Sequence, residues 1–326
     1  MKKYIFILFI SLNFIVTSQV DFLPKGFADH EQKDIDEYLS NFIISSDVIT
    51  DPPNFNVRTM AEWEEIQALT ISWEGYPPIL TEIVRAAVEE CSVFITCDND
   101  DEIEEASDYL NSSNVDLSNV EFLNIATNSI WMRDYGQNTV YKDDVDSLYL
   151  VDWVYNRPNR PDDDAYPEYL ANFMGLDLFQ TVEVPNTLIH TGGNFMSDGF
   201  GTAFSSNLVL DENDISEQEI NEIMDNFMGI ETYIKMETLP FDGIHHIDMH
   251  MKLLDEETLL VAQYPDGMSD GPQIEENIQY ILDNFSTKWG TPFKVIRIPS
   301  PPSLSVMQMD IKPRFIVILL LMLRVK

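Results

Sequence analysis

Four of the eight residues in segment 243–250 (GIHHIDMH) can carry a proton or bind a metal ion, and three of the chain's five histidines lie there. If the segment is a strand, His246, Asp248 and His250 share one face and His245 lies on the other. A histidine and a carboxylate on one face suit general acid–base catalysis. The same three residues suit a metal-dependent hydrolase, although ligands two apart on a strand are roughly 6.8 Å apart at their Cα atoms and need further ligands from elsewhere.

A second segment, 130–136 (IWMRDYG), places a carboxylate between an aromatic side chain and a glycine turn. Trp131 and Asp134 together suit a planar cation, because an aromatic face attracts the cation and a carboxylate can pair with it through two hydrogen bonds. The alternative is a buried Trp131 beside a surface ion pair between Arg133 and Asp134.

Two loops complete the candidate segments. Residues 155–164 (YNRPNRPDDD) hold Arg157 and Arg160 between prolines, where they either grip a carboxylate or pair with the acidic run that follows. Residues 191–202 (TGGNFMSDGFGT) contain four glycines. Because neither a lysine nor a helix follows them, they predict a tight turn near the site and not a phosphate cradle.

The composition is that of an acidic globular protein. Its 326 residues, of which 44% are hydrophobic, suffice for one large domain or two ordinary ones. The net charge of −37 excludes nucleic acid as a partner, because binding phosphates needs clustered lysine and arginine. The charge fits the attraction of cationic substrates such as guanidinium compounds or polyamines, and it equally fits adaptation to salt or solubility.

Residues 1–18 predict a signal peptide. A pair of lysines precedes an apolar run over residues 4–16, and a suitable cleavage site lies before Gln19. The run is shorter than the ~20 residues that a membrane span needs, so we expect a secreted or periplasmic protein without stable membrane insertion. A polar N-terminal lead segment follows over residues 19–57.

The C-terminal end and the cysteines call for separate interpretations. Residues 301–326 form a basic, apolar tail, which suggests an aberrant or out-of-frame end.

The two cysteines, Cys91 and Cys97, flank a strand-like run that would separate them by roughly 20 Å. That separation is too long for a disulfide, so we expect free thiols.

Strands alternate with helices along the chain, which is the pattern of an α/β protein. Ser216 and Glu219 form a capping box before an apolar stripe that ends at Gly229, so the helix over 217–228 is sharply bounded. The sequence predicts further helices over 35–42, 78–90, 102–110 and 273–285, and strands over 66–73, 92–97, 120–125, 130–141, 148–155, 202–210, 249–254, 258–263 and 293–298.

Together these segments resemble the bacterial (Porphyromonas-type) peptidylarginine deiminase and agmatine deiminase family of guanidine-modifying enzymes. The resemblance rests on AEWE at 61–64, ISW at 71–73, and then WMRDYG, YNRP, TGGNFMSDG and HHID, in the family's order. It implies a five-bladed α/β propeller, called pentein, with the site at its centre. The deiminase domain would cover residues 58–300 and would be C-terminally incomplete in this chain.

The resemblance also implies the catalytic residues. Asp134 and Asp248 would bind the guanidinium group, and His246 would protonate the departing ammonia. A cysteine thiolate would attack the guanidinium carbon without any cofactor or metal. The family's nucleophilic cysteine near the C-terminus is missing, since no cysteine follows Cys97. Because loss of such a nucleophile costs on the order of 10⁶ in rate, we expect this chain to be inactive.

Substrate-binding residues are implied in the same way. Trp131 resembles an aromatic wall, and Arg157, with Arg160 as its partner, resembles an arginine that grips the terminal carboxylate of a substrate. Thr191 stands where the agmatine branch usually has a glutamate, which favours the secreted peptidylarginine branch.

The expected activity is therefore hydrolysis of protein- or peptide-bound arginine to citrulline and ammonia. Two alternatives stay open: an agmatine deiminase, which forms N-carbamoylputrescine in putrescine biosynthesis, and a non-catalytic protein that keeps the guanidinium pocket. The expected partner is an arginine-containing peptide or a small guanidino compound. The acidic residues 98–101 lack the spacing of a calcium-binding EF-hand loop, so a solvated acidic turn is expected there.

Overall fold

The computed structural model describes residues 23–28, 30–40 and 48–300. The predicted signal peptide, residues 1–18, and the predicted basic tail, residues 301–326, lie outside the described residues. Within the described ranges, no helix combines the length and the apolar composition that crossing a membrane requires.

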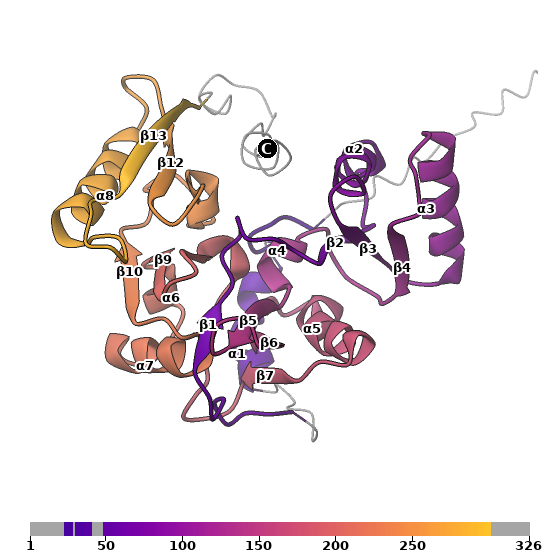
Figure 1. Cartoon of the computed structure of the whole chain (residues 1–326), viewed down its shortest axis with the longest axis horizontal. Helices are drawn as coiled ribbons and strands as arrows, with labels where there is room; N and C mark the ends of the chain where they lie inside the picture. The colour runs from indigo at the N-terminus through magenta and orange to yellow at the C-terminus, as the bar shows by residue number, and fades with distance from the viewer. Residues whose placement is uncertain (1–22, 29, 41–47, 301–326) are drawn as a thin grey trace, which may run out of the picture.

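Four small sheets follow one another around an arc, with helices beside them (Figure 1). The first sheet is parallel, and its chain order is β2 (Ala68–Ser72), α2 (Pro77–Ala87), β3 (Ser92–Cys97), α3 (Asp100–Ser112) and β4 (Val120–Asn124). The second has the strand order β1-β5-β6-β7 and consists of β1 (Val57–Thr59), β5 (Asn138–Lys142), β6 (Ser147–Trp153) and β7 (Leu178–Thr181), with helix α5 (Pro161–Met174).

The third and fourth sheets have three strands each. The third contains β8 (Met196–Ser197), β9 (Thr202–Ser206) and β10 (Thr232–Met236), with helices α6 (Leu208–Asp211) and α7 (Glu217–Met228). The fourth contains β11 (Met251–Leu253), β12 (Thr258–Gln263) and β13 (Lys294–Pro299), with helix α8 (Gly271–Asn284). The short elements that remain are η1 (Glu31–Lys33), α1 (Ile35–Ser40), α4 (Met132–Tyr135), η2 (Gly192–Asn194) and η3 (Ile247–Met249).

Three of the sheets share one topology. In each, two strands pair antiparallel, and a helix then leads to a third strand that lies parallel to the second: β5-β6-α5-β7, β8-β9-α7-β10 and β11-β12-α8-β13. A parallel connection needs a crossover of about a dozen residues or more, which the helix supplies. The predicted α/β class is confirmed. The described residues form four sheets, and the fivefold propeller stays a prediction.

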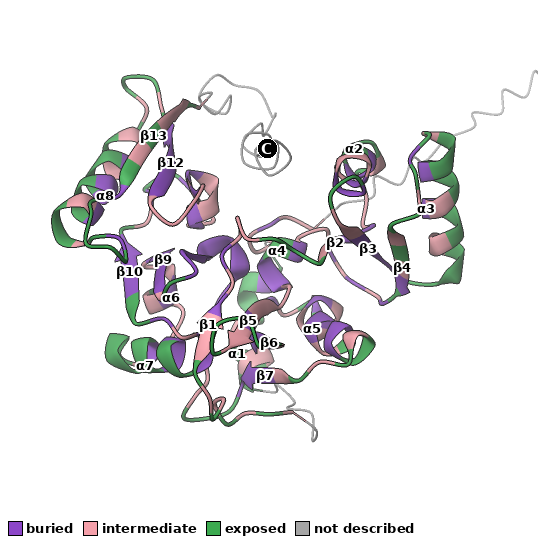
Figure 2. Cartoon of the chain, viewed as in Figure 1, coloured by how far each residue is buried: buried purple, intermediate pink, exposed green. Residues whose placement is uncertain are grey.

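The buried residues of the helices lie on the sides toward the sheets, and exposed residues lie on their outer sides (Figure 2). Helix α7 shows how the sequence produces this arrangement. It begins at the capping box, in which the Ser216 amide donates to Glu219 Oε2 at 2.7 Å, and it ends at Gly229 in the left-handed region, with φ of 66°. Its apolar stripe is buried: Ile220, Ile223, Met224 and Phe227. The predicted bounds 217–228 are confirmed.

Two predicted strands are partly wrong. Over residues 130–141 the chain first makes the single helical turn α4 and only then strand β5. Met132 and Tyr135 are both buried, and a spacing of three residues puts two side chains on one face of a helical turn but on opposite faces of a strand. Over 202–210 the strand ends at Ser206, and the turn α6 follows.

The loop predicted over residues 155–164 is wrong in its second part. Pro161 opens helix α5, because a proline at the first helical position needs no backbone N–H there and already has a helical φ. The other predicted helices and strands are present with bounds that differ by a few residues.

Candidate active site

Three one-turn elements, α4, η2 and η3, meet beside one another and carry the predicted site residues. Asp134 lies on α4. Thr191 directly precedes η2, and Gly193 lies within it. His246 directly precedes η3, and Asp248 lies within it. The structure therefore brings together three motifs that are up to about 110 residues apart in the sequence, as expected for segments that act on one ligand.

The extended conformation considered for residues 243–250 is not what the structure shows before β11. His245 adopts a left-handed conformation with φ of 62°, and residues Ile247–Met249 form the 3-10 helix η3. Ile247 is fully buried in the core of the fourth sheet, which turns the chain inward at this point. A 3-10 helix has three residues per turn, so residues two apart do not share a face. The common face considered for His246, Asp248 and His250 is therefore not formed.

Asp134 and His246 are the two innermost groups of the site. The carboxylate is 1% exposed, the ring is fully buried, and Asp134 Oδ1 lies 3.3 Å from His246 Nδ1. The Gly193 amide donates to Asp134 Oδ1 at 3.1 Å, and Thr191 Oγ1 shares a hydrogen bond of 3.0 Å with His246 Nε2. Asp134 Oδ2 and His246 Nδ1 have no hydrogen-bond partner among the described residues.

Burial by itself disfavours the charged form of Asp134. The positive charge of Lys25 and the neighbouring His246 outweigh that effect and lower the pKa of Asp134 to about 2. Asp134 is therefore a carboxylate at neutral pH, and it can attract a cation.

Two glycines let the backbone of η2 come this close. A Cβ atom on Gly193 would collide with Asp134 Oδ1 and lie 2.6 Å from His246 Nδ1, and a Cβ on Gly192 would collide with the Arg133 carbonyl oxygen. The predicted tight turn near the site is confirmed, and its physical reason is close approach of the backbone to the two inner side chains.

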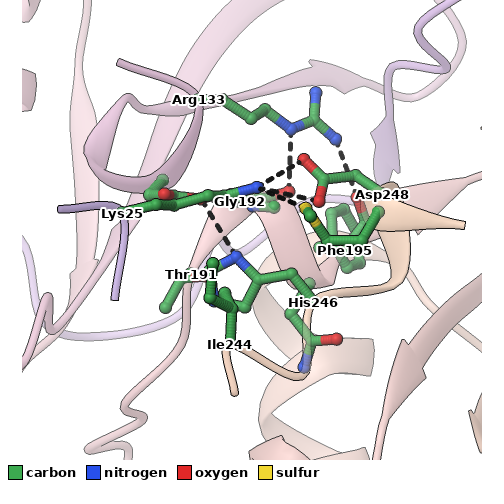
Figure 3. Close-up of polar contacts among 12 residues, drawn as sticks. Lys25, Arg133, Thr191, Gly192, Phe195, Ile244, His246 and Asp248 are labelled. Carbon is green, nitrogen blue, oxygen red and sulfur yellow. Dashed lines mark hydrogen bonds and ion pairs between the residues drawn. The ribbon is translucent and has the colours of Figure 1, made fainter. Parts of the chain in front are cut away.

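Arg133 holds η2 against α4. Its Nε donates to the Gly192 carbonyl at 2.8 Å, and its Nη2 donates to the Phe195 carbonyl at 2.8 Å (Figure 3). Arg133 also pairs with Glu62. The alternative of a surface ion pair between Arg133 and Asp134 is thereby replaced, since Asp134 is buried and Arg133 binds the backbone of the glycine turn.

A residue that the sequence did not suggest completes the site. Lys25, from the lead segment, is 5% exposed, and its Nζ donates to both oxygens of Asp248 at 2.9 and 3.0 Å (Figure 3). Burial disfavours the ammonium, but Asp248 and Asp134 outweigh it, so the pKa of Lys25 is raised. No local pattern marks this lysine, because its partner is 223 residues away in the sequence.

The same lead segment contacts the predicted substrate-binding residues. Trp131 Nε1 donates to the Leu23 carbonyl at 2.8 Å. The guanidinium of Arg157 lies 3.9 Å from the centre of the Phe27 ring.

Arg160 also binds the lead segment, through a buried ion pair. It is fully buried and binds the Glu31 carboxylate at 2.8 and 2.9 Å. Arg160 therefore pairs with Glu31 and not with the acidic run that follows it in the sequence.

The two cysteines lie outside the site and are free thiols, as predicted. Cys97 ends β3 in the core of the first sheet, where burial and the neighbouring Glu102 raise its pKa to about 12. Burial also raises the pKa of Cys91. A nucleophilic cysteine needs a lowered pKa, so neither thiol has the required environment.

The alternative of a metal site made by His246, Asp248 and His250 is not supported among the described residues. His250 is buried beyond η3, and burial lowers its pKa to about 4. The described residues instead bring together Glu74, Asp98 and Glu102, with ligand atoms within 4.8 Å of one another. This cluster includes one of the acidic residues predicted to form a solvated turn.

Comparison with known proteins decides the family. The family model for Porphyromonas-type peptidyl-arginine deiminases matches residues 58–317, which is most of the chain. The chain belongs to this family. The resemblance inferred from the WMRDYG, YNRP, TGGNFMSDG and HHID segments is thereby confirmed.

Similar proteins within the deiminase group carry related names. A Mycoplasma capricolum protein, provisionally named agmatine deiminase, is 26% identical over 217 residues, which cover 60% of this chain and 56% of the relative. The chain thus spans little more than half the length of this relative. Among solved structures, the agmatine deiminase of Enterococcus faecalis has a TM-score of 0.67 at 16% identity and covers 79% of this chain and 74% of its own. A provisionally named arginine deiminase from Porphyromonas gingivalis has a TM-score of 0.65 at 15% identity, over 76% and 78%. These two likenesses support the fold.

Proposed function

We propose that the site binds a guanidinium group and serves the hydrolysis of a guanidino compound to its ureido product and ammonia. The observation that supports this most strongly is the buried oxygen Asp134 Oδ2, which lacks a hydrogen-bond partner among the described residues. Buried polar atoms in native proteins are nearly always hydrogen-bonded. A planar guanidinium offers several N–H donors to a carboxylate, which matches this unfilled acceptor capacity.

In the proposed reaction Asp134 and Asp248 hold the cation planar and protonated. A cysteine thiolate of the kind that the resemblance implies, which these 326 residues do not supply, would form a bond to the guanidinium carbon as the C–N bond breaks, and His246 would donate the proton that leaves with ammonia. Water then attacks the same carbon, loses its proton to His246, and releases the ureido product and the thiol. Trp131 forms one wall of the site, and Arg157 is the candidate for contact with the far end of a substrate.

We propose a small guanidino compound such as agmatine as the first substrate class, because similar proteins carry the name agmatine deiminase. Peptide-bound arginine is the second candidate. It is supported by the description of the matching family and by Thr191, which stands where the agmatine branch usually has a glutamate. Calorimetry with agmatine and with a peptide that ends in arginine compares the two candidates.

The 326 residues supply the binding groups without a suitable nucleophile, so we propose that they bind the substrate and do not turn it over. The purified chain incubated with agmatine or an arginine peptide should form no more ureido product than its His246→Ala variant. Product above that control would overturn the proposal.

Binding is best measured on the Lys25→Met variant, because Lys25 takes both oxygens of Asp248. We expect agmatine to bind with micromolar affinity, and Asp134→Asn in the same background to weaken it about tenfold or more, since a hydrogen bond to a charged group is lost. N-carbamoylputrescine is the matched control ligand, because it has a neutral ureido group in place of the guanidinium. If neither guanidino ligand binds, or if the neutral ligand binds equally well, the proposed function is wrong.

We propose that the four sheets are blades of the five-bladed propeller that the resemblance implies. The shared β-β-α-β order of three sheets and their placement around an arc support this (Figure 1). An experimental structure that shows the four sheets stacked without a common axis would contradict it.

We also propose export, by means of residues 1–18. The basic start and the apolar run support it. Terminal sequencing of the protein from the producing cell and its medium should find a chain that begins at Gln19 outside the cytoplasm, and an intracellular chain that keeps residues 1–18 would contradict it.

A further inference from the structure

The lead segment contacts most of the groups to which a substrate role has been assigned, namely Trp131, Arg157, Arg160 and Asp248. Its Leu23 carbonyl accepts from Trp131, its Lys25 ammonium binds Asp248, and its Phe27 ring lies over Arg157. A Cβ on Gly193 would lie 3.1 Å from Lys25 Nζ as well as beside Asp134 and His246, so the ammonium is at the centre of the site. The chain thus places one of its own cations where the proposed substrate cation belongs.

We propose that residues 23–28 and 30–40 form an intramolecular pseudosubstrate that closes the site until this segment leaves. The inference rests on the proposed function, because it takes the Asp134–Asp248 pair as the guanidinium position. Lys25 satisfies the charge of that position, but its ammonium has no amidino carbon that a nucleophile could attack. It is therefore an occupant that cannot react.

The anchoring of the segment is mainly polar, which makes its departure feasible. Glu31 binds Arg160, the Arg160 Nη2 donates to the Gly26 carbonyl at 3.0 Å, and the Tyr38 hydroxyl donates to Asp164 at 3.0 Å. Helix α1 has no buried residue, and none of the hydrophobic core clusters of the described residues includes a member of 23–40. The segment can therefore leave without opening a core.

Removal of the segment would uncover the charged groups that it binds. Asp248 is the more accessible carboxylate, at 19% exposure, and would meet solvent or ligand first. Asp134 would stay in place through its bond from the Gly193 amide. A guanidino ligand and Lys25 thus compete for the same two carboxylates, and the apparent affinity of the ligand is reduced by the fraction of chains in which the site is closed.

The test compares ligand affinity among full-length variants by calorimetry with agmatine and with a peptide that contains an internal arginine. Lys25→Met keeps most of the unbranched side chain and removes its charge, and Glu31→Gln weakens the anchor outside the guanidinium position. Lys33→Met is the matched control, because Lys33 is an exposed lysine of the same segment. We expect both Lys25→Met and Glu31→Gln to bind about tenfold or more tightly than the unaltered chain, and Lys33→Met to bind like it.

Hydrogen exchange of the unaltered chain gives a second readout. Saturating agmatine should increase exchange of the Asp34 and Tyr38 amides, whose bonds to Glu31 and Asp34 carbonyls belong to the docked segment. Equal affinities of the unaltered chain and both variants, with unchanged exchange, would overturn the pseudosubstrate and leave the proposed function standing. Absence of binding in every variant would overturn both. If Lys25→Met does not fold, Glu31→Gln decides the matter.

Discussion

Asp134 and Asp248 face the same cation, yet they are held in different ways. Asp134 belongs to an inner half of the site, made of Asp134, Thr191, Gly193 and His246, in which a backbone amide and tight glycine packing fix each group. Asp248 belongs to an outer half, made of Asp248, Lys25 and Glu31, in which ion pairs between distant side chains do the holding.

The difference separates a permanent part of the site from a removable one. Backbone contacts of the inner half cannot be exchanged without refolding α4, η2 and η3. In the outer half, a cationic ligand can replace Lys25, because it supplies Asp248 with the positive charge that Lys25 provided. A buried ion pair need not add stability, and in this protein its use fits a switch.

The largest effect should follow from Gly193→Ala, which breaks the inner half. The new methyl group would collide with Asp134 and His246, so we expect a loss of about 3 kcal/mol in the free energy of unfolding and loss of agmatine binding in the Lys25→Met background. Urea unfolding and calorimetry measure both. Gly243→Ala is the control, since a Cβ there meets nothing within 4 Å. Equal stability of the two variants would show that the inner half is not tightly packed.

A pH series on Asp134 should give the next largest effect. Its folded pKa of about 2 lies below the ordinary value of 3.8, so its ionised form stabilises the fold. That contribution, about 2 kcal/mol, is present above pH 4 and is lost as the pH falls toward 2. Unfolding free energies of Asp134→Asn should be flatter over this range than those of the unaltered chain. Parallel curves would contradict the charge coupling between Lys25 and Asp134.

Thr191→Val tests a single contact of the inner half. It removes the hydroxyl that shares a hydrogen bond with His246 Nε2 and leaves a buried ring nitrogen unpaired. We expect a cost of about 1 to 2 kcal/mol in the free energy of unfolding, measured by urea. Thr191→Ser should restore most of it, because it keeps the hydroxyl. A serine variant as unstable as the valine variant would point to packing of the methyl group instead.

Phe27→Ala should have the smallest effect and concerns the outer half alone. Its ring lies over Arg157, and loss of such a contact costs about 0.5 to 1 kcal/mol. Because the contact helps to dock the lead segment, we expect agmatine to bind the variant roughly two- to fivefold more tightly while the unfolding midpoint changes little. Weaker binding would mean that Phe27 supports the site and does not obstruct it.

Local patterns predicted the parts of this protein that local forces determine. The strand at 92–97, the strand at 258–263 and the helix at 217–228 have the predicted bounds, because alternation, capping and a terminal glycine act over a few residues. The residue types in AEWE, ISW, WMRDYG, YNRP, TGGNFMSDG and HHID, taken in their order, were sufficient to indicate the family. That Asp134 and His246 belong to one site followed from that resemblance and not from spacing.

Only the tertiary structure decided how these residues are presented. The one-turn elements α4 and η3 lie in segments whose sequence also suits a strand, since three or four residues are too few to show a helical periodicity of apolar residues. Lys25 was missed because its partner Asp248 lies 223 residues away, and no local pattern encodes such a contact. The sequence determined which groups could bind a guanidinium cation. The packing of the chain determined that one of its own lysines reaches them first.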